Sequence, residues 1–373
     1  MKYCSIIPAL LLIAFPLFAC SFCGDGFARR QPLRERFAES KIVVAGKLKN
    51  AVANANGTGT TEFQIAKVLK GDLGNVSKLT IPRYLPVIGD TPPDYLFFCS
   101  VVDGKIEPVH GVPGSKALSE YLSESAKATG VGARLKFAFA NLDSPDATVA
   151  GDAFLEFARA TDAELVTAKA VLDRTKLRGW IVDPNTPEER VGVYGLLLGL
   201  CGDKSDANYL LAELRAAKPG ERATANLGGL LGGAILLAPD DGWKLATDLL
   251  ADPKRNFSDK LNAISTLRFF QSTRPKESRK RILECLKAVI ANGDLADLAI
   301  DDLRRWQWWD LTATVLDQYS KPTHAAPAIR RGILRYALQC PDEAAKSFLV
   351  DARSKEPDLV KKVESSLKLY EKK

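Results

Sequence analysis

The fold is decided by a stretch that reads TPEERVGVYGLL at residues 186–197. Similar stretches read SPDATVAGDAFL at residues 144–155 and APAIRRGILRYAL at residues 326–338. In each, a proline precedes apolar residues at helical spacing, and proline is tolerated in the first turn of a helix. Ser144 and Thr186 precede two of these prolines as N-cap candidates. The three stretches therefore predict the beginnings of three helices.

The helical pattern around these stretches extends over residues 115–373. The predicted helices form pairs, and the first helices of successive pairs begin near residues 145, 187, 221, 258, 295 and 325. A repeat period of about 30 to 42 residues is typical of a helical solenoid, because each pair must bury its apolar face against the next pair.

The three quoted stretches resemble the first helices of HEAT repeats. The resemblance implies an all-α, ARM-type solenoid over residues 115–373, and proteins of this kind generally serve as binding scaffolds. Together with the segments described below, the pattern also resembles exported bacterial HEAT-like proteins that are uncharacterised.

A β-rich segment precedes the helical pattern, at residues 22–114. Strands are predicted near residues 41–46, 61–69, 78–81, 95–102 and 105–109. The pair Asp103-Gly104 lies between the last two and is a strong hairpin signal. The pattern predicts a small barrel-like domain, so the fold class is α+β with two domains.

Two of these strands carry a second resemblance. Residues 38–48 (AESKIVVAGKL) and 61–71 (TEFQIAKVLKG) are similar to the first two strands of netrin-like domains and of tissue inhibitors of metalloproteases. Those are OB-type barrels, and the inhibitors bind a protease zinc through an N-terminal Cys-x-Cys. This chain instead reads Cys20-Ser21-Phe22-Cys23. The resemblance implies a protease-inhibitor-like role as the alternative function, and the different spacing departs from the inhibitors' pattern.

Residues 1–21 predict an export signal. Lys2 precedes an apolar run at residues 6–18, which is shorter than the ~20 residues of a membrane-spanning helix. Cleavage after Ser21 would make Phe22 the first residue, whereas a bacterial lipobox at residues 17–20 would leave Cys20 lipidated at the new terminus. No other segment is predicted to span a membrane. The protein is thus expected to be secreted or held in the periplasm or cell envelope.

Export changes the interpretation of the 7 cysteines. In an oxidising compartment Cys20, Cys23 and Cys99 are disulfide candidates, either as a bridge within the first pair or as a bridge from one of them to Cys99. Cys201 and Cys285 lie in apolar helical surroundings, where a free cysteine packs as a small hydrophobic residue.

Composition excludes several functional classes. The chain has 2 His, which nearly excludes His-rich zinc sites and His relays, and its net charge of +7 is too small to indicate nucleic-acid binding. No catalytic, cofactor-binding or metal-binding residues are predicted. A non-enzymatic binding protein is therefore expected, with an unrecognised enzyme as a second alternative.

Two further motifs concern packing and binding. Gly228-Gly229 and Gly232-Gly233 form two overlapping pairs of small residues in an apolar run, which predicts a closely packed, buried helix. Three of the 5 Trp lie close together beside two arginines. Because Trp and Arg are enriched in interface hot spots, this cluster predicts a contact surface for a protein or another extracytoplasmic macromolecule. Its members are Arg304, Arg305, Trp306, Trp308 and Trp309.

Overall fold

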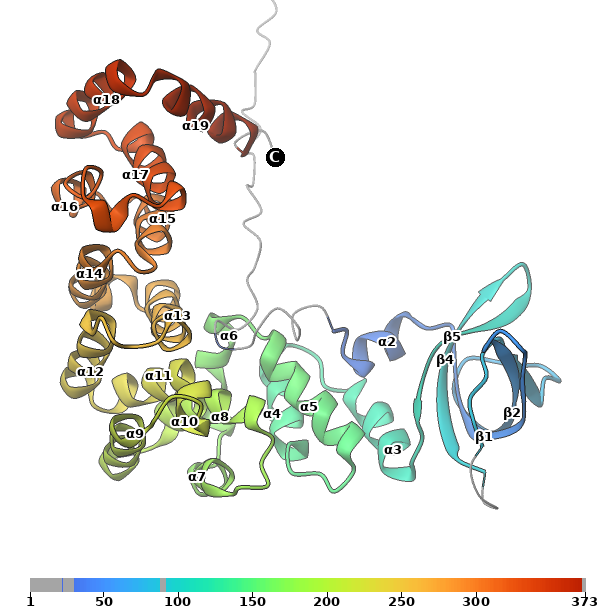
Figure 1. The fold of residues 1–373 in the computed structure, drawn as a ribbon. Coiled ribbons are helices and arrows are strands. Elements are labelled where there is room, and N and C mark those ends of the chain that lie inside the picture. Colours follow the sequence, from blue (N-terminus) through green and yellow to red (C-terminus); the bar gives the residue numbers. More distant parts are fainter. Residues whose placement is uncertain (1–21, 23–29, 88–91, 371–373) are drawn as a thin grey trace, which may run out of the picture.

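The computed structural model describes residues 22, 30–87 and 92–370. The predicted signal at residues 1–21 and Cys23 lie outside these residues. Within the described part of the chain, no helix is both long enough and apolar enough to cross a membrane. The fold consists of a small antiparallel sheet near the N-terminus followed by a helical region (Figure 1).

The sheet has five strands in the order β3-β2-β1-β4-β5, and every neighbouring pair is antiparallel. The strands are β1 (Ile42–Ala53), β2 (Gly59–Lys70), β3 (Lys78–Ile81), β4 (Asp94–Val102) and β5 (Lys105–Pro113). In the described residues no ladder joins β3 to β5, so the predicted barrel is not supported and the sheet is open. The physical reason is the short β3, which pairs only with residues 61–64 of β2.

The hairpin between β4 and β5 confirms the prediction from Asp103-Gly104. Both residues have positive φ values, 49° for Asp103 and 75° for Gly104. Two successive residues of this kind form the turn whose twist matches the twist of the two strands.

Both faces of the sheet are buried near its centre. On one face Ile42 and Val44 of β1 pack with Phe63 inside the curve of the sheet. On the other face Val43 of β1 and Phe98 of β4 join the main core that continues through the helices. The sheet is therefore attached to the helical region through apolar side chains.

The helices of the chain follow one another in sequence order along a curved path, from α3 beside the sheet to α19 at the other end (Figure 1). The first half comprises α2 (Leu33–Glu39), α3 (Lys116–Ser125), α4 (Val131–Asn141), α5 (Ala147–Arg159), α6 (Asp162–Thr167), α7 (Arg174–Val182), α8 (Glu188–Cys201) and α9 (Lys204–Ala216). The second half comprises α10 (Arg222–Ala225), α11 (Leu227–Leu237), α12 (Pro239–Ala251), α13 (Phe257–Thr273), α14 (Pro275–Asn292), α15 (Ala296–Trp306), α16 (Thr312–Leu316), α17 (Pro327–Gln339), α18 (Glu343–Lys355) and α19 (Pro357–Tyr370).

The predicted N-caps of two helices lie slightly too early in the chain. α5 is capped by Asp146, whose carboxylate accepts from the backbone N–H groups of Thr148 and Val149, rather than by Ser144. Pro187 rather than Thr186 occupies the cap position of α8. Asp146 also accepts a hydrogen bond from the Ser115 hydroxyl at 2.5 Å, and this bond fixes where α3 and α5 begin relative to each other.

Helix α2 precedes the sheet in sequence and packs on the helices that follow the sheet. The Leu33 backbone N–H donates to Asp152 of α5 at 2.7 Å. Arg34 donates to Glu156 at 2.9 Å. These bonds connect positions more than a hundred residues apart in sequence, so α2 covers the first layer of the helical region.

Helices α8 and α11 confirm the close packing predicted from the glycines. A Cβ atom added to Gly229 would lie 2.0 Å from the Gly192 carbonyl oxygen, and one added to Gly233 would lie 2.1 Å from the Gly195 carbonyl oxygen. Only glycine leaves room for two backbones at this separation.

Candidate functional site

The predicted tryptophan cluster is not one continuous helix. α15 ends at Trp306, and Gln307 adopts a left-handed backbone with φ of 56°. The turn sends Trp308 inward, where its side chain is 6% exposed, and brings its ring to 5.0 Å from the ring of Trp306. Trp308 is thus buried, and the predicted contact surface stays a prediction that depends on the other members of the cluster.

The guanidinium of Arg279, on α14, lies over the ring of Trp308. It lies 4.5 Å from the centre of the Trp308 ring and forms a 2.6 Å ion pair with Asp310. A cation over an aromatic face adds to the packing energy. The contact joins α14 to the turn after α15.

Trp309 packs on the next helix. Its ring lies edge-on to Tyr336 of α17, with 4.9 Å between the ring centres. Below it, the buried Thr312 hydroxyl donates to Asp342 at 2.7 Å and lies 3.1 Å from the Tyr336 hydroxyl. Trp309 is half-buried, so one part of its ring stabilises this junction and another part reaches the surface.

The two arginines of the cluster differ in exposure and in their contacts. Arg304 contacts Asp301 and donates to Gln339 of α17 at 2.7 Å. Arg305 is exposed and pairs with Asp301 at 2.7 Å. Trp306 is half-buried as well. The side chains that a partner could reach are therefore Arg305, Trp306 and Trp309.

A contact between Phe22 and α11 was missed by the sequence interpretation. Gly229 and Gly233 face the backbone of α8, whereas a Cβ atom added to Gly228 would lie 2.8 Å from the Asn262 carbonyl oxygen of α13, and one added to Gly232 would lie 3.2 Å from Leu196 Cδ1 of α8. The ring of Phe22 lies beside Gly228 and Gly232. Its centre lies 5.4 Å from the centre of the Phe269 ring.

Two distances describe how Phe22 lies against α11. A Cβ atom added to Gly228 would lie 3.1 Å from Phe22 Cδ1, and one added to Gly232 would lie 3.4 Å from Phe22 Cζ. The Thr266 hydroxyl donates to the Gly228 carbonyl oxygen at 2.9 Å and fixes α13 against α11.

A polar network lies where the sheet joins the helices. Asp152 accepts hydrogen bonds from the Leu33 backbone N–H and, at 3.0 Å, from the Tyr121 hydroxyl. Burial raises the pKa of Asp152 to about 6, although both hydrogen bonds oppose the shift. The carboxylate serves to hold three helices together.

A cavity of about 500 Å³ lies beside this network, between α2, the end of β2 and the junction of α3 with α4. Arg34, Arg134 and Lys70 line it together with Phe37 and Val131. Each cation already has a partner. Arg34 and Arg134 pair with Glu156, and Lys70 donates to backbone carbonyls at the end of α2.

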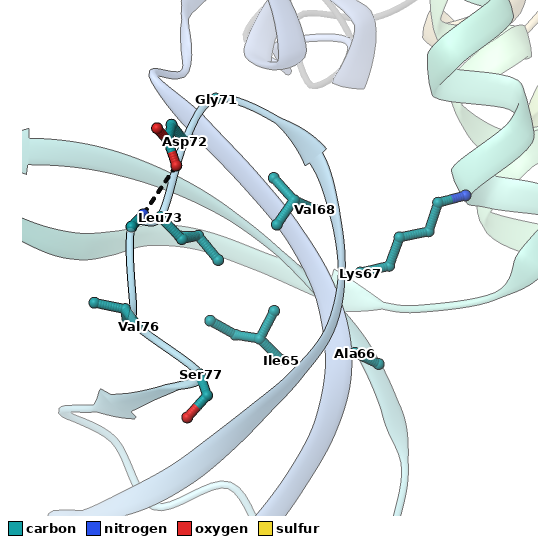
Figure 2. Close-up of a pocket in the computed structure, with 10 residues that line it drawn as sticks. Ile65, Ala66, Lys67, Val68, Gly71, Asp72, Leu73, Val76 and Ser77 are labelled. Carbon is teal, nitrogen blue, oxygen red and sulfur yellow. Dashed lines mark hydrogen bonds between the residues drawn. The ribbon is translucent and has the colours of Figure 1, made fainter.

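A shallower pocket of about 290 Å³ lies between β2 and the loop that leads to β3 (Figure 2). Ile65 and Val68 form one wall, and Leu73 and Val76 form the other. The carboxylate of Asp72 is used within the loop, where it accepts from the Gly74 backbone N–H at 2.9 Å. Lys67 and Ser77 carry the other polar side chains of the lining, and Lys67 points away from the pocket (Figure 2).

The cysteines in the described residues are free thiols. Cys99, Cys285 and Cys340 are buried, and Cys201 is partly exposed. Burial raises the pKa of Cys99 to about 11 and that of Cys285 to about 12.

Cys20 and Cys23 lie outside the described residues, so both proposed disulfide pairings and the lipid on Cys20 stay predictions.

No group of three or more His, Cys, Asp or Glu side chains suited to a metal ion occurs among the described residues. Comparison with family models, with curated proteins and with solved structures gives no match.

Proposed function

We propose that this protein is an exported, non-enzymatic binding protein, secreted or held in the cell envelope. Its helical region is a HEAT-like solenoid, and the preceding sheet belongs to an OB/netrin-like domain that does not close into a barrel. The partner is a protein or another extracytoplasmic macromolecule.

The spacing of polar contacts supports the solenoid. Six hydrogen bonds between neighbouring layers join residues 31 to 35 apart in sequence, and others join residues 36 to 42 apart, within the range of helical-repeat periods. The pairs are Tyr121 with Asp152, Arg174 with Asp206, Gly192 with Asn226, Lys260 with Asp294, Arg268 with Asp302, and Arg304 with Gln339. In a solenoid each repeat contacts mainly its neighbours, which favours contacts about one repeat apart in sequence.

The observation that carries the binding role is the half-buried pair Trp306 and Trp309 beside the exposed Arg305. Trp306 packs on the buried Trp308, and Trp309 packs on the buried Tyr336. A rigid aromatic surface of this kind loses little conformational entropy when a partner covers it, and such residues dominate binding energies.

The test is capture of partners by the immobilised exported chain from the fraction into which it is exported. Trp309→Ala and Arg305→Ala are expected to reduce capture of a specific partner at least about tenfold, the effect of a single hot-spot residue. Trp180→Ala is the matched control, because Trp180 is half-buried and lies on α7, away from this surface.

Melting curves separate binding from stability. Reduced capture with an unchanged melting temperature supports the proposal. If Trp180→Ala reduces capture equally, or if no variant reduces capture, this surface does not bind the partner.

A further inference from the structure

We propose that the cavity between α2, the end of β2 and the start of α4 binds a phosphate monoester, whose phosphate is held by Arg34, Lys70 and Arg134. The cavity has a volume of about 500 Å³ and lies where the sheet joins the helices (Figure 1). This site goes beyond the proposed binding of a macromolecule, since neither Trp306 nor Trp309 lines it.

The first argument is the charge of the cavity wall. Arg34, Lys70 and Arg134 line it from three different elements, and no acidic side chain lines it among the described residues. The acid that the two arginines share, Glu156, is buried and does not line the cavity. A wall with this excess of positive charge attracts an anion.

The second argument is the set of N–H groups that the arginines still offer. Arg34 donates to Glu156 through Nε at 2.9 Å, and its Nη2 lies 3.7 Å from Glu35. Arg134 contacts Glu156 through Nε and Glu164 through Nη2, each at 3.2 Å. Within the described residues, Nη1 of each arginine makes neither a hydrogen bond nor an ion pair. Both guanidinium groups are therefore held in place with donors left for a ligand.

The third argument is the way in which Lys70 is held. Its ammonium donates to the carbonyl oxygens of Phe37 and Ala38 at 2.6 Å and 2.7 Å, and it lies 5.5 Å from the centre of the Phe37 ring. No carboxylate of the described residues forms an ion pair with it. An ammonium can donate one more hydrogen bond, so Lys70 brings a fixed and unneutralised charge to the wall.

The start of α4 adds to this positive wall. Thr129, Gly130 and Val131 line the cavity, and α4 begins at Val131 after Gly130. No side chain caps this helix. The N–H groups and the dipole at a helix N-terminus favour an anion, and here they face the same cavity as the three cations.

The chemical class of the ligand follows from the wall and the volume. A phosphate monoester has one terminal oxygen for each of the three cations, whereas a carboxylate has fewer. The volume lies within the range of about 300 to 1,000 Å³ found for small-molecule sites, so an organic group fits beside the phosphate. The side chains of Phe37 and Val131 provide an apolar wall for that group.

The probe is phenyl phosphate, titrated into the full exported chain by isothermal calorimetry at about pH 7.5, where the phosphate is mostly a dianion. We expect saturable binding of one molecule per chain, at least about tenfold tighter than that of benzoate or of inorganic phosphate. Added salt should weaken it, because the attraction is electrostatic.

Ala126→Glu places a carboxylate on the cavity wall without removing a side-chain contact of the cations. We expect it to weaken binding at least about tenfold. Ser123→Glu is the matched control, because Ser123 is exposed on the same helix and does not line the cavity.

Lys70→Gln is a second variant, which removes the charge and keeps an N–H donor for the end of α2. It should weaken binding at least about fivefold. Its control is Lys78→Gln, since the Lys78 side chain is 67% exposed on β3 and lies outside the cavity. Melting curves identify the variants that keep the wild-type fold, and only these are compared.

Four results would overturn the proposal. One is the absence of saturable phenyl phosphate binding, and another is equally tight binding of benzoate, which would assign the cavity to carboxylates. Equally tight binding of inorganic phosphate would exclude a role for the organic group. The last is a loss in the control variants as large as that in Ala126→Glu and Lys70→Gln. Trp309→Ala is expected to leave phenyl phosphate binding unchanged, so failure of this site and failure of the proposed partner surface are distinguishable.

Discussion

Asp152 of α5 accepts a hydrogen bond from the Leu33 backbone N–H across 2.7 Å, and this bond joins the helix before the sheet to the helices after it. The Tyr121 hydroxyl donates to the other carboxylate oxygen at 3.0 Å. Three helices from two distant parts of the sequence therefore meet at one buried carboxylate.

The first prediction is a pH dependence that comes from Asp152. Burial raises its pKa from 3.8 to about 6, so between about pH 4 and pH 6 the folded chain binds a proton more readily than the unfolded chain does. Its contribution to stability is therefore complete below about pH 4 and is lost as the pH rises through about 6. At about 1.4 kcal/mol per pKa unit, the loss is about 3 kcal/mol.

Urea unfolding at several pH values measures this effect. Asp152→Asn is expected to remove this loss from the plot of unfolding free energy against pH. Asp240→Asn is the control, because the Asp240 side chain is 95% exposed. Identical pH profiles for the wild type and Asp152→Asn would contradict the prediction.

The second prediction concerns the contact between α8 and α11. Gly229→Ala places a Cβ atom 2.0 Å from the Gly192 carbonyl oxygen, so the helices must separate. We expect a loss of about 3 kcal/mol or more in the free energy of unfolding, at the upper end of overpacking effects.

Gly179→Ala is the matched substitution for this test. Gly179 lies inside α7, and its Cβ would meet nothing within 4 Å. It should stabilise the protein by about 0.5 to 1 kcal/mol through helix propensity. Chemical denaturation of both variants gives the comparison, and a loss of similar size in the two would show that the α8 contact is not the cause.

The third prediction concerns the buried Lys260 of α13. Its side chain is 1% exposed, and its ammonium lies 3.2 Å from the Asp294 carboxylate. Asp294→Asn leaves the buried charge without its partner and should cost about 2 kcal/mol, less than for a fully buried pair because Asp294 is half-exposed.

A second substitution tests the cause of that loss. Adding Lys260→Met replaces the charge with an apolar side chain of similar length. The double variant is expected to return to within about 1 kcal/mol of the wild type. Thermal and urea unfolding of both single variants and the double variant give the comparison. If the losses of Asp294→Asn and Lys260→Met simply add in the double variant, the unpaired charge is not responsible.

The fourth prediction concerns the thiols. Cys201 is the partly exposed thiol among the described cysteines, and Cys99, Cys285 and Cys340 are buried. Alkylation of the native protein, followed by peptide mass mapping, should modify Cys201 at least about tenfold faster than the other three, because reaction requires an accessible thiolate. After unfolding, all four should react.

The same experiment tests the predicted disulfide. In Cys201→Ala no rapid alkylation is expected, and Cys20 or Cys23 should be found in a disulfide unless Cys20 carries a lipid. Alkylated Cys20 and Cys23 in native material would refute the bridge.

Local signals were enough to predict much of the fold. Asp103-Gly104 fixes its hairpin because the turn requires positive φ values that these residues adopt readily. The helical pattern predicted from residue 115 onward begins with α3 at Lys116, and the stretch at residues 326–338 forms α17, which begins at its proline, Pro327. Such features depend on neighbours in sequence, so a sequence can reveal them.

Other features depend on contacts that a local pattern does not contain. α2 has 7 residues and one buried side chain, Leu33, and it is held by α5 rather than by its own sequence. Trp308 is buried because the left-handed backbone at Gln307 ends α15 before it, and the sequence pattern does not contain that turn. The contact of Phe22 with Phe269 joins residues far apart in sequence, which only the tertiary structure shows.

The placement of α2 has a consequence for dissecting the molecule. The chain leaves the helical region after Glu39 and returns at Ser115, so the sheet is topologically an insertion. A protease that cuts at Gly114 would nick the molecule without separating it, since Leu33 would still hold the N-terminal fragment to Asp152. The minimal helical fragment therefore has to retain residues 33–39, joined by a linker that replaces the sheet.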